Sequence, residues 1–406
     1  MKPVSELVWA RHRVRESKNM DTYSDIRPYH DDEVAEVLGR LLADRELLNA
    51  MGGLRLPRLH RYFPKLIRPL VSATLRYQMR NVRSIADFQA IVKGYMDTMI
   101  EGSTRDFSTG GTVRLQRDQA YLFISNHRDI ALDPAFVNYA LYHNDMDTVR
   151  IAIGDNLLSK PFAADLMRVN KSFIVRRSAK GPRQMLAAFK QLSSYIRFSL
   201  QQEKSSIWIA QREGRAKDGN DATEVALVKM ICMSQDKSRE DFGEFIAGLN
   251  IVPVSISYEW DPLDAAKAQE LVMLESTGSY QKAEHEDLKS IATGILGDKG
   301  HVHVSFGDVL TGNFSSPAEV AAAIDEQVIA NYRLHASNVL AYQRVHQDER
   351  WRELADLDIS ESDIQAFEQR FAAMPESYRL RAMSIYAQPI LNKLALRDKQ
   401  RLQEVS

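Results

Sequence analysis

Proton-transfer chemistry is suggested by one histidine, His127, that has two acidic residues close behind it in the chain. The stretch YLFIS reads as a buried strand, so Ser125, Asn126 and His127 follow at its carboxyl end, where α/β proteins commonly display functional side chains. An imidazole titrates near neutral pH, and a carboxylate from Asp129 or Asp133 can fix its tautomer. His127 is therefore a candidate general base. The same residues also fit a histidine at a helix start beside acids that suit the helix dipole.

Cations and glycine follow two further predicted strands. The strand in FIVRR ends in a pair of arginines, and a guanidinium group presents a fork of donors that suits phosphate oxygens. The strand SIWIA is followed by REGRAKDG, in which glycine lets the backbone approach a ligand and the cations suit a phosphate. Both patterns also fit polar surface turns. The residues concerned are Arg176, Arg177, Glu213, Gly214, Arg215 and Lys217.

The order of these segments carries more information than any of them alone. The SNHRD segment, the GDNLL segment with FIVRR, the REGR segment and the VPV strand follow one another between about residues 115 and 260. In this order they resemble the four sequence blocks of the glycerolipid acyltransferase superfamily, which comprises the glycerol-3-phosphate and 1-acylglycerol-3-phosphate acyltransferases. The helical regions on either side lie outside the resemblance.

The resemblance implies a role for each matching residue. His127 would be the general base, and a nearby aspartate would orient it. The family places four residues between the two, whereas five separate His127 from Asp133 and one separates it from Asp129. Asp133 is the favoured orienting acid and Asp129 stays a candidate. The third block also departs from the family pattern, because Arg215 follows Gly214 directly. The implied acceptor-binding residues are Arg128, Asn156, Arg176, Arg177, Glu213, Gly214, Arg215 and Lys217.

The implied activity is transfer of a fatty acyl group from acyl-CoA or acyl carrier protein to a hydroxyl of 1-acylglycerol-3-phosphate in phospholipid synthesis. Glycerol 3-phosphate, or another lipid acceptor such as an ornithine or glycan lipid, is the alternative within this class. A non-catalytic peripheral membrane-binding protein is the alternative from a different class. Direct transfer needs no covalent acyl-enzyme, no cofactor and no metal. Cys232 lies in the amphipathic run EVALVKMICM and reads as a packing residue.

The pattern of elements predicts an α/β fold with a mixed sheet flanked by helices. Residues 1–105 read as helical, and the turn-rich stretch Gly102–Gly111 marks a boundary. From there to residue 315, the runs YLFIS, VRIAI, SFIVR, SIWIA, IVPVSIS and VHVSFG alternate with helical segments, which is typical of α/β architecture. Residues 316–406 form a helical C-terminal region that opens with a capping box at Ser316–Glu319 and a proline at the first helical position.

Composition narrows the location and the partners. The chain has 406 residues, a formal net charge of -1 and one cysteine, which fits a globular protein of a reducing compartment, so a cytoplasmic location is expected. The N-terminal sequence has no apolar run of signal-peptide length, and no window reaches the length of a membrane span. A nearly neutral chain without a recognisable nucleic-acid module argues against a nucleic-acid partner.

A basic and apolar segment suggests how such a chain would reach a lipid. Between Arg55 and Arg83 there are eight Lys or Arg residues and no acid, interleaved with leucine, isoleucine and phenylalanine. Such a segment can lie on an anionic membrane surface, so we expect a protein peripheral to the inner face of the membrane. The segment equally fits a basic surface packed on the core. His301 and His303, two apart on a predicted strand, could share a face as metal ligands, but no third ligand is evident.

Overall fold

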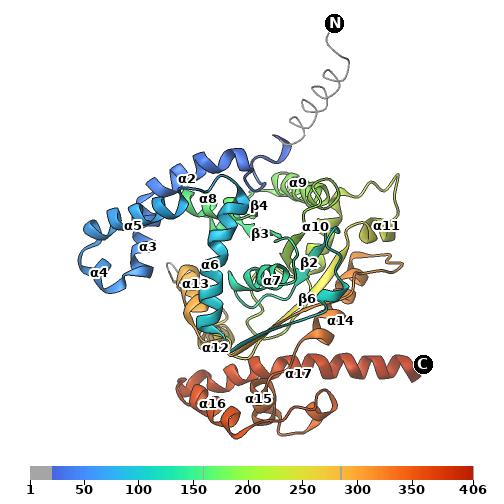
Figure 1. Ribbon diagram of the computed structural model, residues 1–406. Helices are drawn as coiled ribbons and strands as arrows, with labels where there is room; N and C mark the ends of the chain where they lie inside the picture. Colours follow the sequence, from blue (N-terminus) through green and yellow to red (C-terminus); the bar gives the residue numbers. More distant parts are fainter. Residues whose placement is uncertain (1–20, 159, 284–285, 406) are drawn as a thin grey trace. The chain divides into compact units, whose positions relative to one another are not determined.

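The computed structural model describes residues 21–158, 160–283 and 286–405, and these fall into two units (Figure 1). One unit holds the described residues up to Tyr95 together with Arg150–Tyr195. The other holds Met96–Val149 and the described residues from Ile196 onward. The N-terminal sequence that lacks a signal-like apolar run lies outside the described residues.

These two units cut across the three consecutive segments predicted as 1–105, 106–315 and 316–406, which stay a prediction. The strands near residues 150–175 group with the N-terminal helices, and the C-terminal helices group with the main sheet. Within the turn-rich stretch Gly102–Gly111, helix α6 (Ile85–Ser103) ends and strand β1 (Asp106–Gly110) begins. Local composition could not reveal how the segments group, since the grouping depends on contacts between segments that are distant in sequence.

The larger unit is built on five strands in the order β1-β7-β6-β2-β5. β2 pairs in parallel with β5 and β6, β1 pairs in parallel with β7, and β6 pairs antiparallel with β7, so the sheet is mixed. β6 lies at its centre, and all eight of its residues are buried. The bounds not yet given are β2 (Leu122–Ser125), β5 (Ile207–Ala210), β6 (Ile251–Tyr258) and β7 (His301–Phe306).

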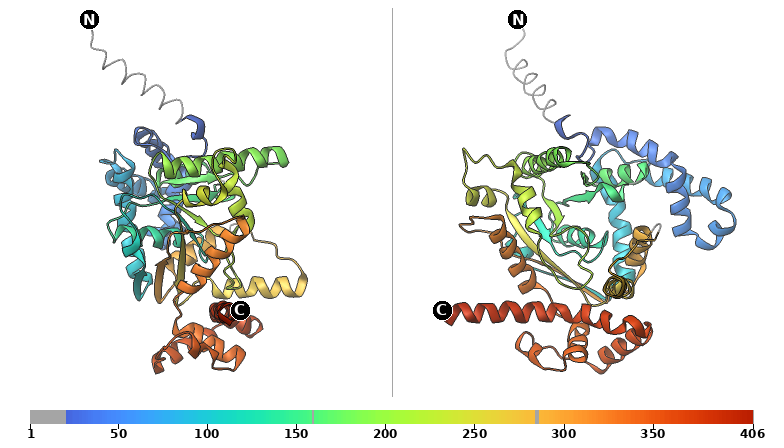
Figure 2. Two further views of the ribbon diagram at one scale, coloured as in Figure 1. Left: turned by 90° about the vertical axis from the view of Figure 1, so that its right-hand side faces the viewer. Right: turned by 180° about the vertical axis from the view of Figure 1, so that it is seen from behind.

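Helices flank this sheet, which confirms the predicted fold class (Figures 1 and 2). α7 packs on β7, and α14 packs on β6. The C-terminal helices form a separate apolar core with α12 that includes Trp260, Trp351, Phe367 and Phe371. The helices of this unit are α7 (Leu132–Tyr142), α10 (Val225–Ile231), α11 (Phe242–Ala247), α12 (Asp264–Thr277), α13 (Glu286–Leu296), α14 (Pro317–Asn331), α15 (Ala336–His346), α16 (Glu361–Ala372) and α17 (Glu376–Val405).

The smaller unit joins N-terminal helices to a parallel pair of strands, β3 (Arg150–Gly154) and β4 (Ser172–Val175). α2 packs on α8, and Val34 and Val37 share one buried cluster with Val169. The helices are α2 (Val34–Ala43), α3 (Arg45–Arg55), α4 (Pro57–Tyr62), α5 (Pro64–Met79) and α8 (Pro161–Val169), while α9 (Pro182–Gln201), like α6, runs across the division. In the part of the chain that the structure describes, no helix has the length and apolar character to span a membrane.

All six predicted strands are present, because each is a short β-prone apolar run that pairs with a neighbouring strand. The helix start at Ser316 is also confirmed: the Ser316 side chain accepts a hydrogen bond from the Glu319 amide, and Pro317 is the first helical residue. The Glu319 carboxylate does not complete the predicted capping box. It accepts hydrogen bonds from the amide and the hydroxyl of Ser315 instead.

β1 and β7 together hold a polar cluster around Ser108. The Ser108 hydroxyl lies 2.6 Å from Nε2 of His301 and 2.7 Å from Nδ1 of His303. Burial, reinforced by the charge of Arg333, lowers the pKa of His301 below its ordinary value and that of His303 to about 4. Asp106, 3.7 Å from His301, opposes the shift at that ring. Both imidazoles are therefore neutral at pH 7.

We expect this cluster to make the larger unit acid-sensitive. The pKa of His303 is lower in the folded chain than its ordinary 6.5, so its contribution is present above pH 6.5 and is lost as the pH falls toward 4. Between pH 7 and pH 5 the loss in the free energy of unfolding should be on the order of 2 kcal/mol. Urea unfolding at the two pH values measures it. His303→Gln, which does not titrate, should flatten this dependence, and an unchanged slope would contradict the assignment.

Candidate active site

His127 stands at the carboxyl end of β2 with one ring nitrogen on a buried acid. Its Nδ1 lies 2.8 Å from Oδ2 of Asp133, which is wholly buried, while 13% of the imidazole side chain is exposed. A carboxylate oxygen can only accept, so Nδ1 carries the hydrogen and Nε2 keeps its lone pair. The ring also meets the indole of Trp208 edge-on, with 5.9 Å between centroids. This arrangement leaves Nε2 able to take a proton from a substrate.

The Asp133 carboxylate accepts three hydrogen bonds besides that of the imidazole. The amides of Arg128 and Asp129 donate to Oδ2 at 2.6 and 2.9 Å, and the Tyr258 hydroxyl donates to Oδ1 at 2.7 Å. Burial raises the pKa of Tyr258 well above its ordinary value, which keeps that hydroxyl protonated as a donor. These three donors fix the orientation of the Asp133 carboxylate, and the carboxylate in turn fixes the orientation of the imidazole.

Asp129, the other candidate for the orienting acid, makes hydrogen bonds to the backbone and not to the imidazole. Its Oδ1 accepts hydrogen bonds from the amides of Ala131 and Leu132, both at 2.9 Å, as a cap at the start of α7. Its Oδ2 also lies against Gly294 of α13, where an added Cβ would come within 2.2 Å. The longer spacing to Asp133 works because the chain turns after His127, so that the amides of Arg128 and Asp129 donate to the Asp133 side chain.

Asn126 holds the start of this turn to the sheet, and sequence reasoning gave it no role. Its side-chain oxygen accepts from the Ile256 amide at 2.8 Å, and its amide nitrogen donates to the Ile256 carbonyl at 3.0 Å. The residue is completely buried. Asn126 thereby continues the β2–β6 ladder one step past the end of β2 and fixes where His127 leaves the sheet.

The loop that contains Glu213, Gly214 and Arg215 lies directly beside His127. The Ala216 amide donates to the His127 carbonyl at 2.8 Å, which ties the loop to the histidine backbone. Gly214 has a φ of +73° with no atom within 4 Å of an added Cβ, so the backbone there is open on one side. Arg215 is half-buried and makes no hydrogen bond or ion pair with any residue that the structure describes. It is therefore an available cation next to the base.

Arg128 and Lys217, both predicted to bind substrate, are instead engaged within the protein. The Arg128 guanidinium is buried and pairs with Asp221 at 2.6 Å, with a further hydrogen bond to the Gly219 carbonyl at 3.2 Å. The Lys217 ammonium pairs with Glu270 of α12. Arg128 thus closes the 211–221 loop from inside, because a buried guanidinium needs a charged partner.

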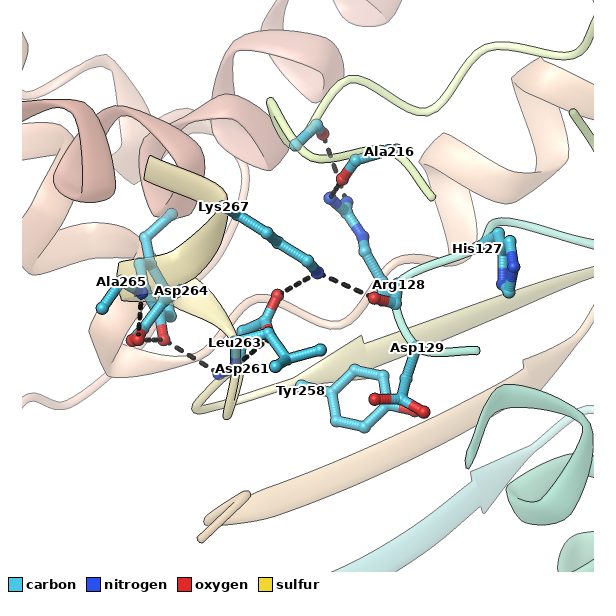
Figure 3. A network of polar contacts seen from close by, with 12 residues as sticks. His127, Arg128, Asp129, Ala216, Tyr258, Asp261, Leu263, Asp264, Ala265 and Lys267 are labelled. Atoms are coloured by element: carbon cyan, nitrogen blue, oxygen red, sulfur yellow. Dashed lines mark hydrogen bonds and ion pairs between the residues drawn. The ribbon is translucent and has the colours of Figure 1, made fainter. Parts of the chain in front are cut away.

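A second buried pair supports the same turn from α12 (Figure 3). The Lys267 ammonium donates to the Arg128 carbonyl at 2.7 Å and pairs with Asp261. Burial alone would raise the pKa of Asp261, but the Lys267 charge outweighs it and holds that pKa below its ordinary value. No spacing in the sequence pointed to Lys267 or Asp261, since both lie far along the chain from His127. The turn after His127 is thus held by charged groups on both sides.

The remaining predicted binding residues, Asn156, Arg176 and Arg177, belong to the smaller unit. Arg176 pairs with Asp25, and the Arg177 amide donates to the Asp155 carboxylate at 3.1 Å. Asn156 lies against Gly154, where an added Cβ would meet its side-chain oxygen at 2.4 Å. The structure describes this unit by itself, so a share of these residues in substrate binding stays a prediction.

Two other chemistries find no support in the part of the chain that the structure describes. No group of three or more potential metal ligands occurs among these residues. Burial raises the pKa of the Cys232 thiol to about 12, so the thiol has almost no thiolate character at neutral pH and is a poor nucleophile.

Comparison with known proteins agrees with this site. Residues 107–257 match the family model described as Acyltransferase, and this range contains His127, Asp133 and the 211–221 loop. Two relatives are dihydroxyacetone phosphate acyltransferases. The one from Bos taurus is 27% identical over 206 residues, and the one from Homo sapiens is 26% identical over 202 residues. Each match covers 49% of this chain and 28% of the relative, so the chain matches little more than a quarter of their length.

A solved structure also aligns with the chain. It is the 1-acyl-sn-glycerophosphate acyltransferase from Thermotoga maritima, at 13% sequence identity with a TM-score of 0.35, covering 70% of this chain and 95% of that one.

The matched range, the ordered blocks and a histidine held by a buried aspartate at a strand end agree with one another. Over residues 107–257 this chain is therefore similar to the acyltransferases of glycerolipid metabolism.

Proposed function

We propose that this chain is an O-acyltransferase that moves a fatty acyl group from acyl-CoA or acyl carrier protein to a hydroxyl of a glycerophosphate-type acceptor. The observation that carries the proposal is the 2.8 Å contact between Nδ1 of His127 and the buried Asp133, which leaves Nε2 as a base. Arg215, a cation without a partner among the described residues, is well suited to the acceptor's phosphate.

The reaction proceeds by direct transfer. Nε2 of His127 takes the proton of the acceptor hydroxyl as its oxygen attacks the thioester carbonyl. The carbon–sulfur bond then breaks, and the thiolate leaves with the proton that His127 carried, so the base is regenerated. The amides of Arg128 and Asp129 are already used by Asp133. Other donors must therefore stabilise the oxyanion.

1-Acylglycerol-3-phosphate is the first acceptor that we propose. Dihydroxyacetone phosphate is the second, because it is the acceptor in the names of the relatives. Both molecules present a free hydroxyl and a phosphate on a three-carbon backbone, which is the chemistry that a base beside a cation would recognise. The proposal includes a cytoplasmic location peripheral to the inner face of the membrane, where a lipid acceptor and a water-soluble thioester meet.

Removal of the base tests the activity. His127→Ala should lower kcat by about a thousandfold, the contribution of a well-placed general base, with acyl transfer measured from a labelled thioester. His143→Ala, which changes an exposed histidine, is the matched control and should retain full activity. Equal activity of the two variants would contradict the proposed base.

A panel of acceptors tests the specificity. Wild-type protein should acylate 1-acylglycerol-3-phosphate or dihydroxyacetone phosphate faster than glycerol 3-phosphate or an ornithine or glycan lipid. Mass spectrometry of the products identifies the acylated acceptor. Vesicle binding without turnover on any acceptor would instead favour a non-catalytic membrane-binding protein.

The two acids should separate cleanly in mutagenesis. Asp133→Asn keeps the size of the side chain but destabilises the required tautomer of His127, so kcat should fall at least about a hundredfold. Asp129→Asn can still cap α7, so its kcat should stay within about threefold of wild type. Measurement of kcat for both variants, alongside their unfolding by urea, checks this expectation. A larger loss of kcat in Asp129→Asn than in Asp133→Asn would mean that Asp129 orients His127, and it would contradict this expectation.

Arg215 should act on the phosphate of the acceptor. Arg215→Gln should raise KM for a phosphorylated acceptor about 10- to 100-fold, the worth of a charge-assisted hydrogen bond. KM for an acceptor without phosphate, such as a monoacylglycerol, should barely change. Lys217→Gln is the control, because Lys217 is already paired with Glu270. The same increase in KM for both variants would mean that the effect is one of general charge.

A further inference from the structure

Helix α5 of the smaller unit has three distinct faces. Ile67, Val71 and Leu75 are buried against Leu48 of α3 in one apolar cluster. With about 3.6 residues per turn, the other residues of α5 divide into two stripes. One stripe contains Lys65, Arg68, Ser72 and Arg76. The other contains Leu66, Leu70 and Tyr77.

The cationic stripe lines a hollow of about 420 Å³ where α5 meets α3 and the end of α2. Its lining includes Arg45, Lys65, Arg68 and Arg76 and no acidic residue. Arg76 is held by neutral acceptors, the Ser72 hydroxyl at 3.3 Å and the Leu42 carbonyl at 3.4 Å. The other three cations make no hydrogen bond or ion pair with any described residue. The hollow therefore concentrates positive charge that no acid among the described residues of this unit pairs with.

The nearest acids in sequence are already engaged elsewhere. Asp44 accepts a hydrogen bond from the Leu47 amide as the cap of α3, and Glu46 pairs with Lys160. Four basic groups around one small space repel one another unless an anion joins them. A phosphate group is the anion that suits Arg and Lys side chains arranged in this way.

The second stripe of α5 exposes large apolar side chains. Leu66 and Leu70 are 71% and 57% exposed, and Tyr77 is also exposed. Leu59 and Phe63, in α4 and directly after it, are likewise more than half exposed. Large apolar side chains gathered on neighbouring helices mark a surface that meets another apolar phase. On α5 this surface borders the cationic stripe along the whole helix.

We infer that α4 and α5 dock on a bilayer with the hollow as a binding site for the phosphate of an anionic phospholipid. The apolar stripe enters the acyl region while Arg45, Lys65 and Arg68 take the headgroup phosphate at the level where a lipid presents it. This inference rests on the peripheral membrane location proposed above and names the lipid class that the site selects. Of the eight basic residues between Arg55 and Arg83, Lys65, Arg68 and Arg76 line the hollow and the others do not.

Two other occupants explain less. A soluble phosphate ester would use the cations but not the exposed Leu66, Leu70 and Phe63. An acidic acyl carrier protein would match the charge of the hollow, but its charge does not account for the large exposed apolar side chains of α4 and α5. An anionic bilayer offers phosphates to the cationic stripe and acyl chains to the apolar stripe.

Vesicle flotation of the full chain tests the inference with two lipid mixtures, phosphatidylcholine alone and phosphatidylcholine with phosphatidylglycerol. The triple variant Arg45→Gln, Lys65→Gln, Arg68→Gln should bind the anionic vesicles about 100-fold more weakly, since each basic group near such a surface contributes about fivefold. Its binding to neutral vesicles should not change. Leu66→Ser with Leu70→Ser should lower binding to both kinds of vesicle.

Matched controls separate the hollow from general charge and hydrophobicity. Lys204→Gln, Lys229→Gln and Lys237→Gln remove the same charge from exposed positions of the larger unit. Leu296→Ser with Leu380→Ser removes two exposed leucines. Both controls should bind vesicles like wild type. Equal weakening by either control, or no loss in the triple variant, would overturn the inference.

Competition identifies the source of the phosphate. Release from the vesicles by inorganic phosphate at concentrations equal to that of the lipid would mean a soluble anion site and would overturn the inference. So would loss of acyl carrier protein binding in the triple variant with vesicle binding intact. The triple variant should also keep wild-type acyl transfer between a short-chain thioester and a soluble acceptor. If wild type transfers no acyl group while the vesicle results hold, the proposed function fails and the lipid site stands.

Discussion

The carboxyl group of Asp133 receives four hydrogen bonds, and the site depends on them. A buried carboxylate with donors on both oxygens is held in one orientation, and it holds the imidazole that donates to it. Removing one donor would leave a buried group partly unsatisfied, at a cost of about 1–3 kcal/mol. The local backbone supplies two of the donors. Once the turn after His127 has folded, its hydrogen bonds to Asp133 therefore fix the orientation of the imidazole.

Charged groups from distant parts of the chain hold that turn in place. Arg128 pairs with Asp221 on the inner side of the 211–221 loop, and Lys267 of α12 donates to the Arg128 carbonyl while it pairs with Asp261. Breaking a buried pair by removing one partner costs about 3–5 kcal/mol. The C-terminal helices extend this support, because Arg370 pairs with Asp264 and the Tyr386 hydroxyl donates to the same carboxylate. The helical C-terminal region thus contributes to the rigidity of the turn after His127.

The strands and the position of His127 were predictable because their signals are local. YLFIS, SIWIA and IVPVSIS are short β-prone runs, and a strand of this kind needs only a partner to become part of the sheet. His127 could be found because it follows such a run. Strand β1 was missed, since DFSTG has the composition of a turn and becomes a strand only through its pairing with β7. The grouping of β3 and β4 with N-terminal helices was missed for the same reason.

By itself the sequence determined the fold class, the strands and the histidine, since hydrophobic periodicity and the residue after a strand are properties of neighbouring residues. Only the tertiary structure decided between Asp129 and Asp133, because the choice depends on which side chain the backbone amides of the turn can reach. Tertiary structure likewise decided that Arg128 and Lys217 are paired while Arg215 has no partner among the residues that the structure describes. The sequence does not show whether a cation is paired, because the acid that pairs with it comes from a distant part of the chain.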